Sequence, residues 1–494
     1  MSLGHAASDV GARRRWFAIQ RILGALIAVV GATMLPSLML TVAYGDGQIG
    51  VFVPVIGACW LVGFALWFPV RRERHQLRTR DGFLVVTLIW FTACAVYAFP
   101  LTGEPTDLSY IDALFESTSG LTTTGATVLT DIESLPRSLL FYRQWLHFLG
   151  GMGIVILAVA VLPMLRIGGA QLFRAETTGP VKDNRLTPRI AETAKKLWIA
   201  YVVLNVACAV AYWLAGMSVF DAITHAFSTV ATGGYANYDA SFGHFDSVLI
   251  EVIAIIFMIA GALNFALHYL AWARATTTHY FDDAETRTFA SVLGGFALLT
   301  VIMLWLAGTF DLGGAVRHGI FQLVSTMTTT GFGTTGFAVW PAHIGMLMLL
   351  VALIGGCSGS TTGGLKVVRV LILFRQATRE ILQLVHPRGR FLVKVGQLSV
   401  PGQVLAAVTA FAMLYATCLV VLSFAVAATG TDMVTAVSAV IATLTNMGPG
   451  LGEVANNYGP LNDVAIAILT VAMLLGRLEV FTILVLLSMT FWRD

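Results

Sequence analysis

The chain has 494 residues, of which 57% are hydrophobic and 12% are charged, and its formal net charge is +3 at pH 7. With a mean hydropathy of +0.80, this composition lies far outside the range of soluble proteins and indicates a polytopic membrane protein. Apolar runs fill nearly the whole chain, so the composition excludes a protein built around a soluble enzyme domain.

Apolar windows of about 20 residues, the length that crosses a bilayer as a helix, begin at ten places along the chain. They start near Ile22, Gly50, Gly82, Leu139, Leu197, Val248, Phe289, Ile344, Val404 and Val464. The first window follows three arginines, Arg13 to Arg15, and shows no small-residue cleavage site. We therefore expect an uncleaved helix there rather than a signal peptide.

Basic residues gather in three connectors, within residues 71–80, 166–196 and 366–394. The positive-inside rule places these connectors, and with them the N-terminus, in the cytoplasm. A topology signal explains the basic runs by itself, and a docking surface for a cytosolic partner is the additional interpretation.

Four stretches of the sequence repeat one pattern, and we call them frames one to four. They read "DALFESTSGLTTTGA" from Asp112, "DAITHAFSTVATGGY" from Asp221, "HGIFQLVSTMTTTGF" from His318 and "TAVSAVIATLTNMGP" from Thr435. In each frame the first residue precedes a glycine by 13 positions, a short helical pattern lies between them, and long apolar runs flank the whole. Internal repetition of this kind sets the architecture of a chain.

The pattern predicts a short helix, a polar loop and a second helix in each repeat. About ten helical residues cover only about 15 Å, so each short helix reaches half-way through a bilayer before the chain turns. Irregular backbone at that depth is tolerated where it lines an aqueous path. Four such loops meeting on one axis would present carbonyl oxygens to a dehydrated cation, and glycine would permit the backbone angles that align them.

We therefore predict an all-α polytopic membrane protein. Four repeats of helix, re-entrant pore loop and helix would surround a pseudo-fourfold pore, after an N-terminal two-helix hairpin. The predicted parts are an N-terminal segment with the hairpin, pore repeat one, a cytoplasmic connector with pore repeat two, pore repeat three, and a second connector with pore repeat four. Their ranges are 1–80, 81–165, 166–273, 274–375 and 376–494.

The run "GGCSGSTTGG", residues 355–364, interrupts a window that would otherwise form a helix. Each interior glycine costs a helix about 1 kcal/mol relative to alanine, so we expect this run to unwind. The Gly-Lys-Ser/Thr of a phosphate-binding loop is absent, because Lys366 lies between Leu365 and Val367. A packing kink is the interpretation that the residues alone support.

Arg477 is the most costly residue to bury, because we expect one helix from about Asn462 to Trp492 that places it near the middle of the bilayer. A central arginine costs about 2.5 to 3.5 kcal/mol on the gentlest scale. This cost argues for a water-filled position or for pairing with nearby carbonyls or Glu479. At the outer mouth, Asp112, Glu116 and Asp221 would concentrate cations, although Asp112 and Asp221 could instead cap their short helices.

Three further stretches accompany the frames: 150–198, which begins "GGMGIVILAVAVLPM", "GGCSGSTTGGLKVVR" (355–369) and "GRLEVFT" (476–482). Together with the frames, they resemble the TrkH branch of the Trk/Ktr/HKT potassium transporters over nearly the whole chain. The resemblance implies a potassium uptake subunit of the bacterial inner membrane, usually a homodimer with one pore per chain. It also implies gating by a cytosolic TrkA-type ring that binds nucleotides, with potassium as the transported ion and no cofactor bound to this chain.

The resemblance carries the family's potassium-binding filter onto sixteen positions. They are Thr123, Thr124, Gly125, Ala126, Thr232, Gly233, Gly234, Tyr235, Thr329, Thr330, Gly331, Phe332, Asn446, Met447, Gly448 and Pro449. A serine replaces the first-loop glycine in sodium-carrying relatives, so Gly125 points to potassium. Met447 and Pro449 depart most from a potassium-channel filter, which implies modest selectivity.

The resemblance also implies gating residues below the filter, where an arginine projects into the pore and an intramembrane loop closes it. They are Arg477, Gly355, Gly356, Ser358, Gly359, Ser360, Thr361, Thr362, Gly363, Gly364 and Lys366. Lys366, at the cytoplasmic end of that loop, is placed to transmit movement from a partner.

Two other classes of function stay open on the sequence alone. Potassium symport coupled to sodium or protons also uses broken membrane segments, although its inverted repeats differ from four frames that run in the same sense. A membrane receptor or enzyme is the third class, and the sequence shows no paired catalytic groups or metal-ligand spacing to support it.

Overall fold

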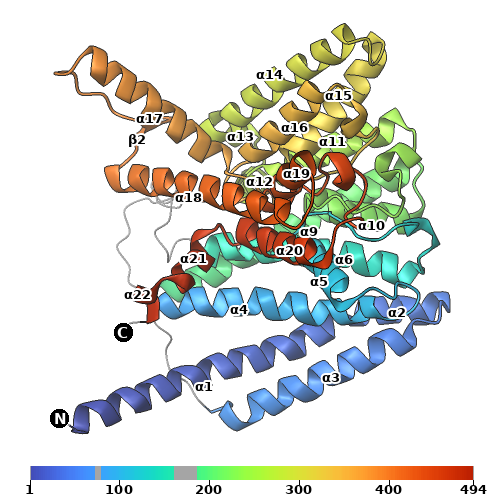
Figure 1. Ribbon diagram of the computed structural model, residues 1–494, viewed down its shortest axis with the longest axis vertical. Coiled ribbons are helices and arrows are strands. Elements are labelled where there is room, and N and C mark those ends of the chain that lie inside the picture. The colour runs from blue at the N-terminus through green and yellow to red at the C-terminus, as the bar shows by residue number, and fades with distance from the viewer. Residues whose placement is uncertain (1, 73–78, 161–185, 493–494) are drawn as a thin grey trace. The chain divides into compact units, whose positions relative to one another are not determined.

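The computed structural model describes residues 2–72, 79–160 and 186–492, and its elements are helices apart from one short hairpin of strands (Figure 1). The helices and strands are α1 (Ser2–Thr33), α2 (Leu35–Tyr44), α3 (Ile49–Trp67), α4 (Thr79–Ala98), α5 (Tyr110–Leu121), α6 (Arg137–Ala160), α9 (Leu186–Leu214), α10 (Val219–Val230), α11 (Val248–Ala262), α12 (Phe265–Arg274), α13 (Thr278–Asp282), α14 (Ala284–Leu306), α15 (Leu312–Met327), α16 (Ala342–Ile354), α17 (Val367–Val385), β1 (Lys394–Val395), β2 (Leu398–Ser399), α18 (Gly402–Ala427), α19 (Met433–Leu444), α20 (Asp463–Arg477), α21 (Phe481–Leu487) and α22 (Met489–Trp492). Short 3-10 turns are Phe68–Val70, Phe99–Thr102, Ile132–Ser134, Ser241–His244, Phe337–Val339 and Gly452–Val454. Much of the basic connector predicted within 166–196 lies outside the described residues.

The chain forms two compact units. Unit one contains Met1–Thr118, Ser134–Arg143 and Leu478–Asp494, and unit two contains Ser119–Glu133 and Gln144–Arg477. All four predicted loops, the run 355–364 and Arg477 therefore belong to unit two.

Unit one contains the predicted N-terminal hairpin, in which α1 and α3 lie side by side (Figure 1). Gly24 and Gly63 meet at this contact, and a Cβ on either would lie within 3 Å of the other's carbonyl oxygen. Small residues let two apolar helices approach in this way, which gains dispersion energy where lipid offers no hydrophobic driving force. The hairpin between residues 22 and 70 is thus confirmed, with the short helix α2 in its turn.

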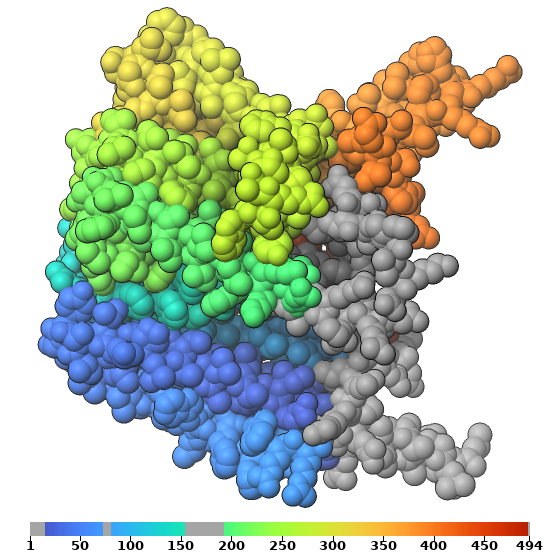
Figure 2. All heavy atoms as spheres, turned by 180° about the vertical axis from the view of Figure 1, so that it is seen from behind, coloured from blue at the N-terminus to red at the C-terminus, as the bar shows by residue number. Residues whose placement is uncertain are grey.

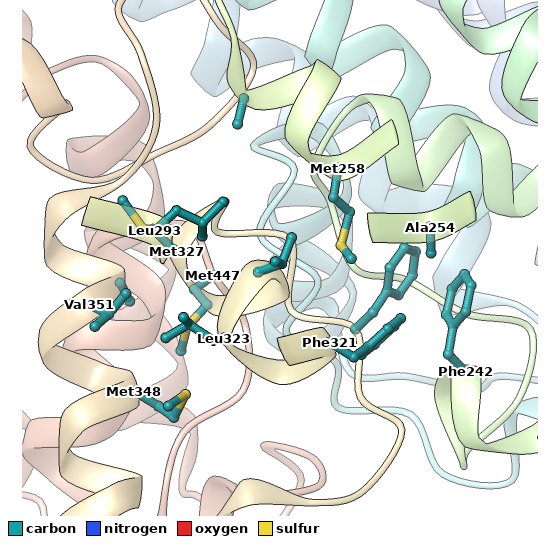
Figure 3. Packing of buried hydrophobic residues seen from close by; sticks show 14 of the residues in the cluster. Phe242, Ala254, Met258, Leu293, Phe321, Leu323, Met327, Met348, Val351 and Met447 are labelled. Carbon is teal, nitrogen blue, oxygen red and sulfur yellow. The ribbon is translucent and has the colours of Figure 1, made fainter. Parts of the chain in front are cut away.

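Unit two is built around an apolar core that surrounds the short helix α15. Figure 3 shows Phe321, Leu323 and Met327 of α15 among side chains of neighbouring helices, including Met258 of α11 and Met348 of α16. All five side chains are fully buried. The C-terminal half of α15, from Phe321 onward, is buried on every side, so this end is held in one place, and frame three begins its loop there.

Six helices are long and apolar enough to cross a membrane, and two bent pairs bring the number to eight, counted over the described residues. The ten predicted spans are thus too many by this measure. The window near Ile344 is wrong as a full span, because α16 ends after 13 residues at Ile354, where the glycine run begins. The windows near Val248 and Val464 are broken spans, bent by 100° between α11 and α12 and by 112° between α20 and α21.

The short helices of the four frames are α5, α10, α15 and α19, with 12, 12, 16 and 12 residues. Twelve residues cover about 18 Å, which is less than the hydrocarbon core of a bilayer at about 30 Å. The half-membrane length predicted from the frames is therefore confirmed for three of the four helices, and α15 is one turn longer.

Helix α17 projects from the remainder of unit two. Figure 2 shows it in orange. Its first turn is buried, whereas Phe374, Ile381 and Leu384 farther along are 72%, 62% and 82% exposed. The glycine run 355–364 lies immediately before its buried end.

Candidate functional site: four loops in a ring

The four frames share one backbone conformation where the short helix ends. The residue two before each glycine has a positive φ of 51° to 55°, and the glycine itself has a φ of 80° to 96°. The residues with the lower values are Thr123, Thr232, Thr329 and Asn446. A β-branched residue at positive φ is a genuine outlier, so three of the four loops hold a threonine in a strained conformation of the kind that collects at functional sites.

The hydrogen bonds at these helix ends are also the same in all four frames. In frame one the Thr123 amide donates to the Gly120 carbonyl at 3.1 Å and the Thr124 amide to the Ser119 carbonyl at 2.9 Å. The corresponding pairs in the other frames measure 3.0–3.1 Å and 2.8 Å. This pair of bonds is the Schellman motif, which ends a helix at a left-handed residue, usually glycine. Threonine or asparagine takes that place here.

The loops then close into a ring through their glycines. A Cβ built on each glycine would overlap the carbonyl oxygen of the residue just before the glycine of the next frame. The pairs are Gly125 with Gly233, Gly234 with Thr330, Gly331 with Met447, and Gly448 with Thr124. Because the fourth pair returns to frame one, the contacts form a cycle, and no other residue type fits at these glycines.

This ring places carbonyl oxygens from four segments of the chain in one layer. In an ordinary strand, successive carbonyl oxygens point to opposite sides. A left-handed residue at every second position turns the peptide groups, so that successive carbonyl oxygens can point to the same side. Carbonyl rings of this kind replace the hydration shell of a potassium ion in known filters. The ring therefore has the chemistry of a site for a monovalent cation.

The hydroxyls of the three left-handed threonines form hydrogen bonds with residues outside the frames. The Thr123 hydroxyl accepts a hydrogen bond from Arg477 Nη2. The Thr232 hydroxyl donates to the Thr361 hydroxyl at 3.1 Å, and the Thr329 hydroxyl accepts from the Gly363 amide at 2.8 Å.

In frame four, Asn446 Nδ2 donates to the Thr124 hydroxyl and to the Met473 carbonyl, both at 3.0 Å. The sequence-predicted gating residues Arg477, Thr361 and Gly363 thus contact predicted filter residues directly.

Arg477 is 5% exposed and lies at the end of a helix, not in the middle of one. The expectation of one helix from Asn462 to Trp492 is wrong, because Glu479 and Val480 take positive φ values of 55° and 50° and the chain turns there. Arg477 Nη1 donates to the Thr361 carbonyl at 2.9 Å. Carbonyl and hydroxyl oxygens therefore accept hydrogen bonds from both terminal nitrogens of the guanidinium, whereas its buried Nε has no partner among the described residues.

The run 355–364 forms a closed loop between α16 and α17, as the glycine content predicts. Its backbone is tied to the break between α11 and α12, where the Cys357 amide donates to the Ala262 carbonyl at 2.9 Å and the Phe265 amide to the Gly359 carbonyl at 3.2 Å. The Thr361 hydroxyl is placed to donate to the Val230 carbonyl at 3.0 Å or the Gly261 carbonyl at 3.1 Å. The loop is well fastened, and Ser360, Thr361 and Thr362 are buried.

Two charged residues anchor the ends of this loop. Glu285, at the start of α14, accepts a 2.6 Å hydrogen bond from the Ser358 amide through Oε1. Lys366 is 8% exposed, and its ammonium donates to the carbonyl and to the hydroxyl of Thr362. Its side chain folds back onto the loop, and the role predicted for Lys366 in transmitting movement from a partner stays a prediction.

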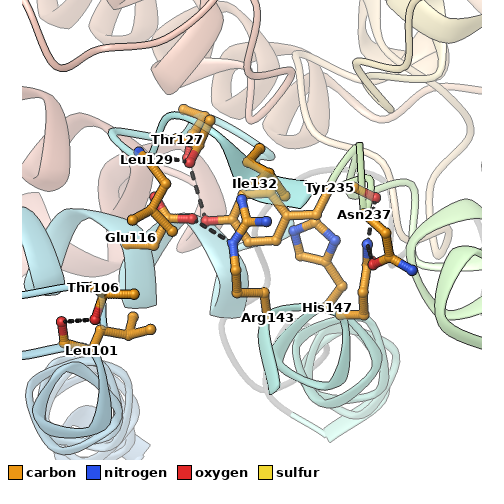
Figure 4. Close-up of polar contacts among 12 residues, drawn as sticks. Leu101, Thr106, Glu116, Thr127, Leu129, Ile132, Arg143, His147, Tyr235 and Asn237 are labelled. Atoms are coloured by element: carbon orange, nitrogen blue, oxygen red, sulfur yellow. Dashed lines mark hydrogen bonds and ion pairs between the residues drawn. The ribbon is translucent and has the colours of Figure 1, made fainter. Parts of the chain in front are cut away.

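The second loop rests on α6. Figure 4 shows the imidazole ring of His147 beside the ring of Tyr235, and the ring centroids are 4.3 Å apart. The His147 Nδ1 atom lies 3.0 Å from the Ser228 hydroxyl, and Gln144 Nε2 donates to the Tyr235 carbonyl at 2.9 Å. A Cβ on Gly233 would overlap this imidazole.

Glu116 does not serve as a cation attractant. It forms a 2.9 Å ion pair with Arg143 inside unit one, and both side chains are about 1% exposed or less (Figure 4). The expectation for this residue is wrong, because a buried carboxylate that is neutralised by a guanidinium presents no net charge to an ion.

Asp112 and Asp221 are not the capping residues either. The caps are Ser109 and Ser218, three residues earlier. Their hydroxyl oxygens accept hydrogen bonds from the backbone amides of Asp112 and Asp221 at 3.2 and 3.0 Å. Each aspartate occupies the third helical position, and its carboxylate accepts a hydrogen bond from the serine hydroxyl. This arrangement resembles a capping box. In frame four Asp432 is the true cap, and its hydrogen bonds with the Thr435 side chain and amide hold its pKa below the usual range.

Sequence reasoning missed four residues that contact the loops: Glu285, Gln144, His147 and Tyr458. The Tyr458 hydroxyl donates to the Gly448 carbonyl at 2.7 Å. None of the four lies within a frame. Glu285 follows Asp283, the N-cap of α14, so its position resembles an ordinary first-turn acid. Only contacts across the fold distinguish these residues.

Comparisons with known proteins agree with this arrangement. The family model TrkH, described as a cation transport protein, matches residues 49–493. The chain is 47% identical over 477 residues to the Trk system potassium uptake protein TrkH of Halomonas elongata, covering 96% of this chain and 99% of the relative. It is 46% identical to the protein of the same name from Escherichia coli K12, over 97% of this chain and 99% of the relative.

A solved structure is similar throughout. The crystal structure of the potassium transporter TrkH from Vibrio parahaemolyticus superposes with a TM-score of 0.90 at 46% identity, covering 97% of this chain and 99% of that one. Family model, relatives and solved structure all cover nearly the full chain, and the chain belongs to the TrkH family of cation transport proteins.

Proposed function

We propose that this protein takes up potassium across the bacterial inner membrane, with the ring of four loops as its ion-selective site. The observation that carries the proposal is the cycle of glycine and carbonyl contacts from frame one to frame four and back. Its relatives are named potassium uptake proteins. The proposed ion ligands are backbone carbonyls of the sixteen filter positions, because carbonyl dipoles match a large monovalent cation without the cost of a fixed negative charge.

Arg477 and the loop 355–364 act in this proposal as the barrier on one side of the ring. Arg477 contacts Thr123 of frame one, and Thr361 contacts both Thr232 and Arg477. A positive charge beside the last ring of oxygens raises the energy of a cation there. The loop occupies the same place, so we assign the structure to a closed state.

The proposed orientation rests on the basic connectors, and the proposed partners rest on the resemblance to the TrkH family. We propose a cytoplasmic N-terminus, a homodimer with one ion path per chain, and regulation by a TrkA-type nucleotide-binding subunit on the cytoplasmic side. Lys366 is buried, so a partner would act on the loop through the projecting helix α17 rather than through this side chain.

Coupled symport is the second candidate, and the bent pairs α11–α12 and α20–α21 favour it, because broken helices build ion sites in secondary transporters. The four frames run in the same sense, which favours conduction. Uptake of radioactive rubidium into proteoliposomes, with sodium and pH gradients imposed in turn, separates the two. Uptake that is independent of both gradients supports conduction, and uptake that follows either gradient supports symport.

A further inference from the structure

The hydrogen-bond partners of the filter carbonyls differ between frame four and the other three. In frames one to three, a side chain donates to the carbonyl of the residue just after the glycine. These bonds run from the Tyr235 hydroxyl to Ala126 at 3.3 Å, from Gln144 Nε2 to Tyr235 at 2.9 Å and from the Ser325 hydroxyl to Phe332 at 2.7 Å.

In frame four the carbonyl that accepts the side-chain hydrogen bond lies one residue earlier in the frame. The Tyr458 hydroxyl donates to the carbonyl of Gly448 itself at 2.7 Å. Within the described part of the chain, the carbonyls of Gly125, Gly234 and Gly331 accept no protein hydrogen bond, and neither does that of Pro449. The ring of glycine carbonyls is therefore unequal, with three open oxygens and one that is shared.

Tyr458 is well placed to hold this bond. It is 1% exposed, and its amide donates to the Thr127 carbonyl at 2.8 Å, so its backbone is fastened to the chain just beyond frame one. Pro449 follows Gly448 and has no amide hydrogen, and proline also restricts the residue before it. A side-chain hydroxyl thus fixes a carbonyl direction in the frame where the backbone has lost a donor.

We propose that Tyr458 is a specificity-determining residue of the ion path, acting through the Gly448 carbonyl. This inference rests on the proposed function of the ring. A carbonyl that shares its lone pairs with a hydroxyl offers a weaker field to a cation, and a weak field favours the larger ion, potassium, over sodium. The bond also fixes the oxygen, so the site cannot contract around a smaller ion. Both effects act in the same direction.

The test is the potassium-to-sodium permeability ratio of Tyr458→Phe in liposomes. This variant keeps the ring and removes only the hydroxyl. We expect the ratio to fall by about fivefold, the factor that one neutral hydrogen bond supports, while rubidium uptake continues. Tyr415→Phe is the matched control, because Tyr415 is also buried in unit two and donates at 3.2 Å to the Leu444 carbonyl, which is not a filter position.

A folded Tyr458→Phe protein with an unchanged ratio would overturn the inference, and so would an equal fall in both variants. A wild-type protein without potassium preference would instead overturn the proposed function, so the two failures are distinguishable. If Tyr458→Phe does not fold, a fluorotyrosine at position 458 keeps the ring and strengthens the hydroxyl as a donor. The ratio should then rise, and a fall or no change would contradict the assignment.

Discussion

Arg477 and Thr361 are joined by a 2.9 Å hydrogen bond from Nη1 of the arginine to the carbonyl oxygen of the threonine. The same guanidinium contacts the Thr123 hydroxyl, and the Thr361 hydroxyl accepts a hydrogen bond from Thr232. The loop 355–364 is therefore bonded through Arg477 to Thr123 of frame one and directly, through Thr361, to Thr232 of frame two. The state of the loop and the geometry of the ring are physically connected.

Arg477→Ala should raise potassium flux. A unit charge about 4 Å from an ion costs it about 4 kcal/mol at an effective dielectric constant of about 20, so a tenfold rise is a modest expectation. Rubidium uptake into proteoliposomes measures it. Arg477→Lys is the matched control, because it keeps the charge and loses the fork of donors, and its flux should stay near that of the wild type. A lower flux in folded Arg477→Ala protein would refute the barrier role.

Gly125→Ser should admit sodium. Gly125 has a φ of 80°, and a Cβ there would overlap the Gly233 carbonyl oxygen, so the ring must distort at this point. We expect the potassium-to-sodium permeability ratio to fall by about tenfold or more, as for the loss of about 1.4 kcal/mol of discrimination. Gly295→Ser is the control, since a Cβ at Gly295 meets nothing within 4 Å. An unchanged ratio in Gly125→Ser would count against the filter assignment.

Thr361→Val should weaken closure of the loop. Valine has nearly the same shape but cannot donate to the Val230 or Gly261 carbonyl or accept from Thr232. The loss of about 1 kcal/mol for a net buried hydrogen bond predicts a basal leak about fivefold higher, measured as rubidium efflux without activating partner. Thr300→Val is the control, because Thr300 is equally buried and its hydroxyl has no hydrogen-bond partner among the described residues.

Deletion of residues 358–363 extends the same test. It removes the anchor between Glu285 and the Ser358 amide as well as the Thr361 contacts. We expect a leak larger than that of Thr361→Val. A shortened protein that still closes as tightly as the original would place the gate elsewhere.

Glu116→Gln should destabilise the protein without changing its ion preference. Removing one partner of a buried ion pair costs about 3 to 5 kcal/mol, because the other charge is left uncompensated. The melting temperature in detergent should therefore fall clearly, and the Glu116→Met, Arg143→Met double variant should recover much of the loss. A change in the permeability ratio of Glu116→Gln would show that this carboxylate acts on ions after all.

Much of the fold and part of the site follow from residue patterns. The four frames can be recognised in the sequence because threonine and glycine at fixed spacing cannot continue a membrane helix. For the same reason, the five glycines within 355–364 separate α16 from α17. These are local effects of backbone conformation, and a sequence displays them directly.

The remaining features depend on contacts between distant segments. Hydropathy continues through Glu479 and Val480, and only their positive φ values place Arg477 at a helix end. Glu116 resembles a surface acid until Arg143 is seen beside it. Thr123, Thr232 and Thr329 take a conformation that glycine normally supplies, which no propensity predicts, because the contacts of the ring and of the loop below it outweigh the local cost.

The cycle of frames is closed by a single polypeptide, so mutations alter such a ring differently from one built of identical subunits. In an assembly of four identical subunits, one altered codon appears in every quarter of the pore at once. Here a codon changes one quarter alone, so a single oxygen can differ, as at Gly448, while the other three quarters stay unchanged. Ion preference can then drift in small steps instead of through fourfold jumps.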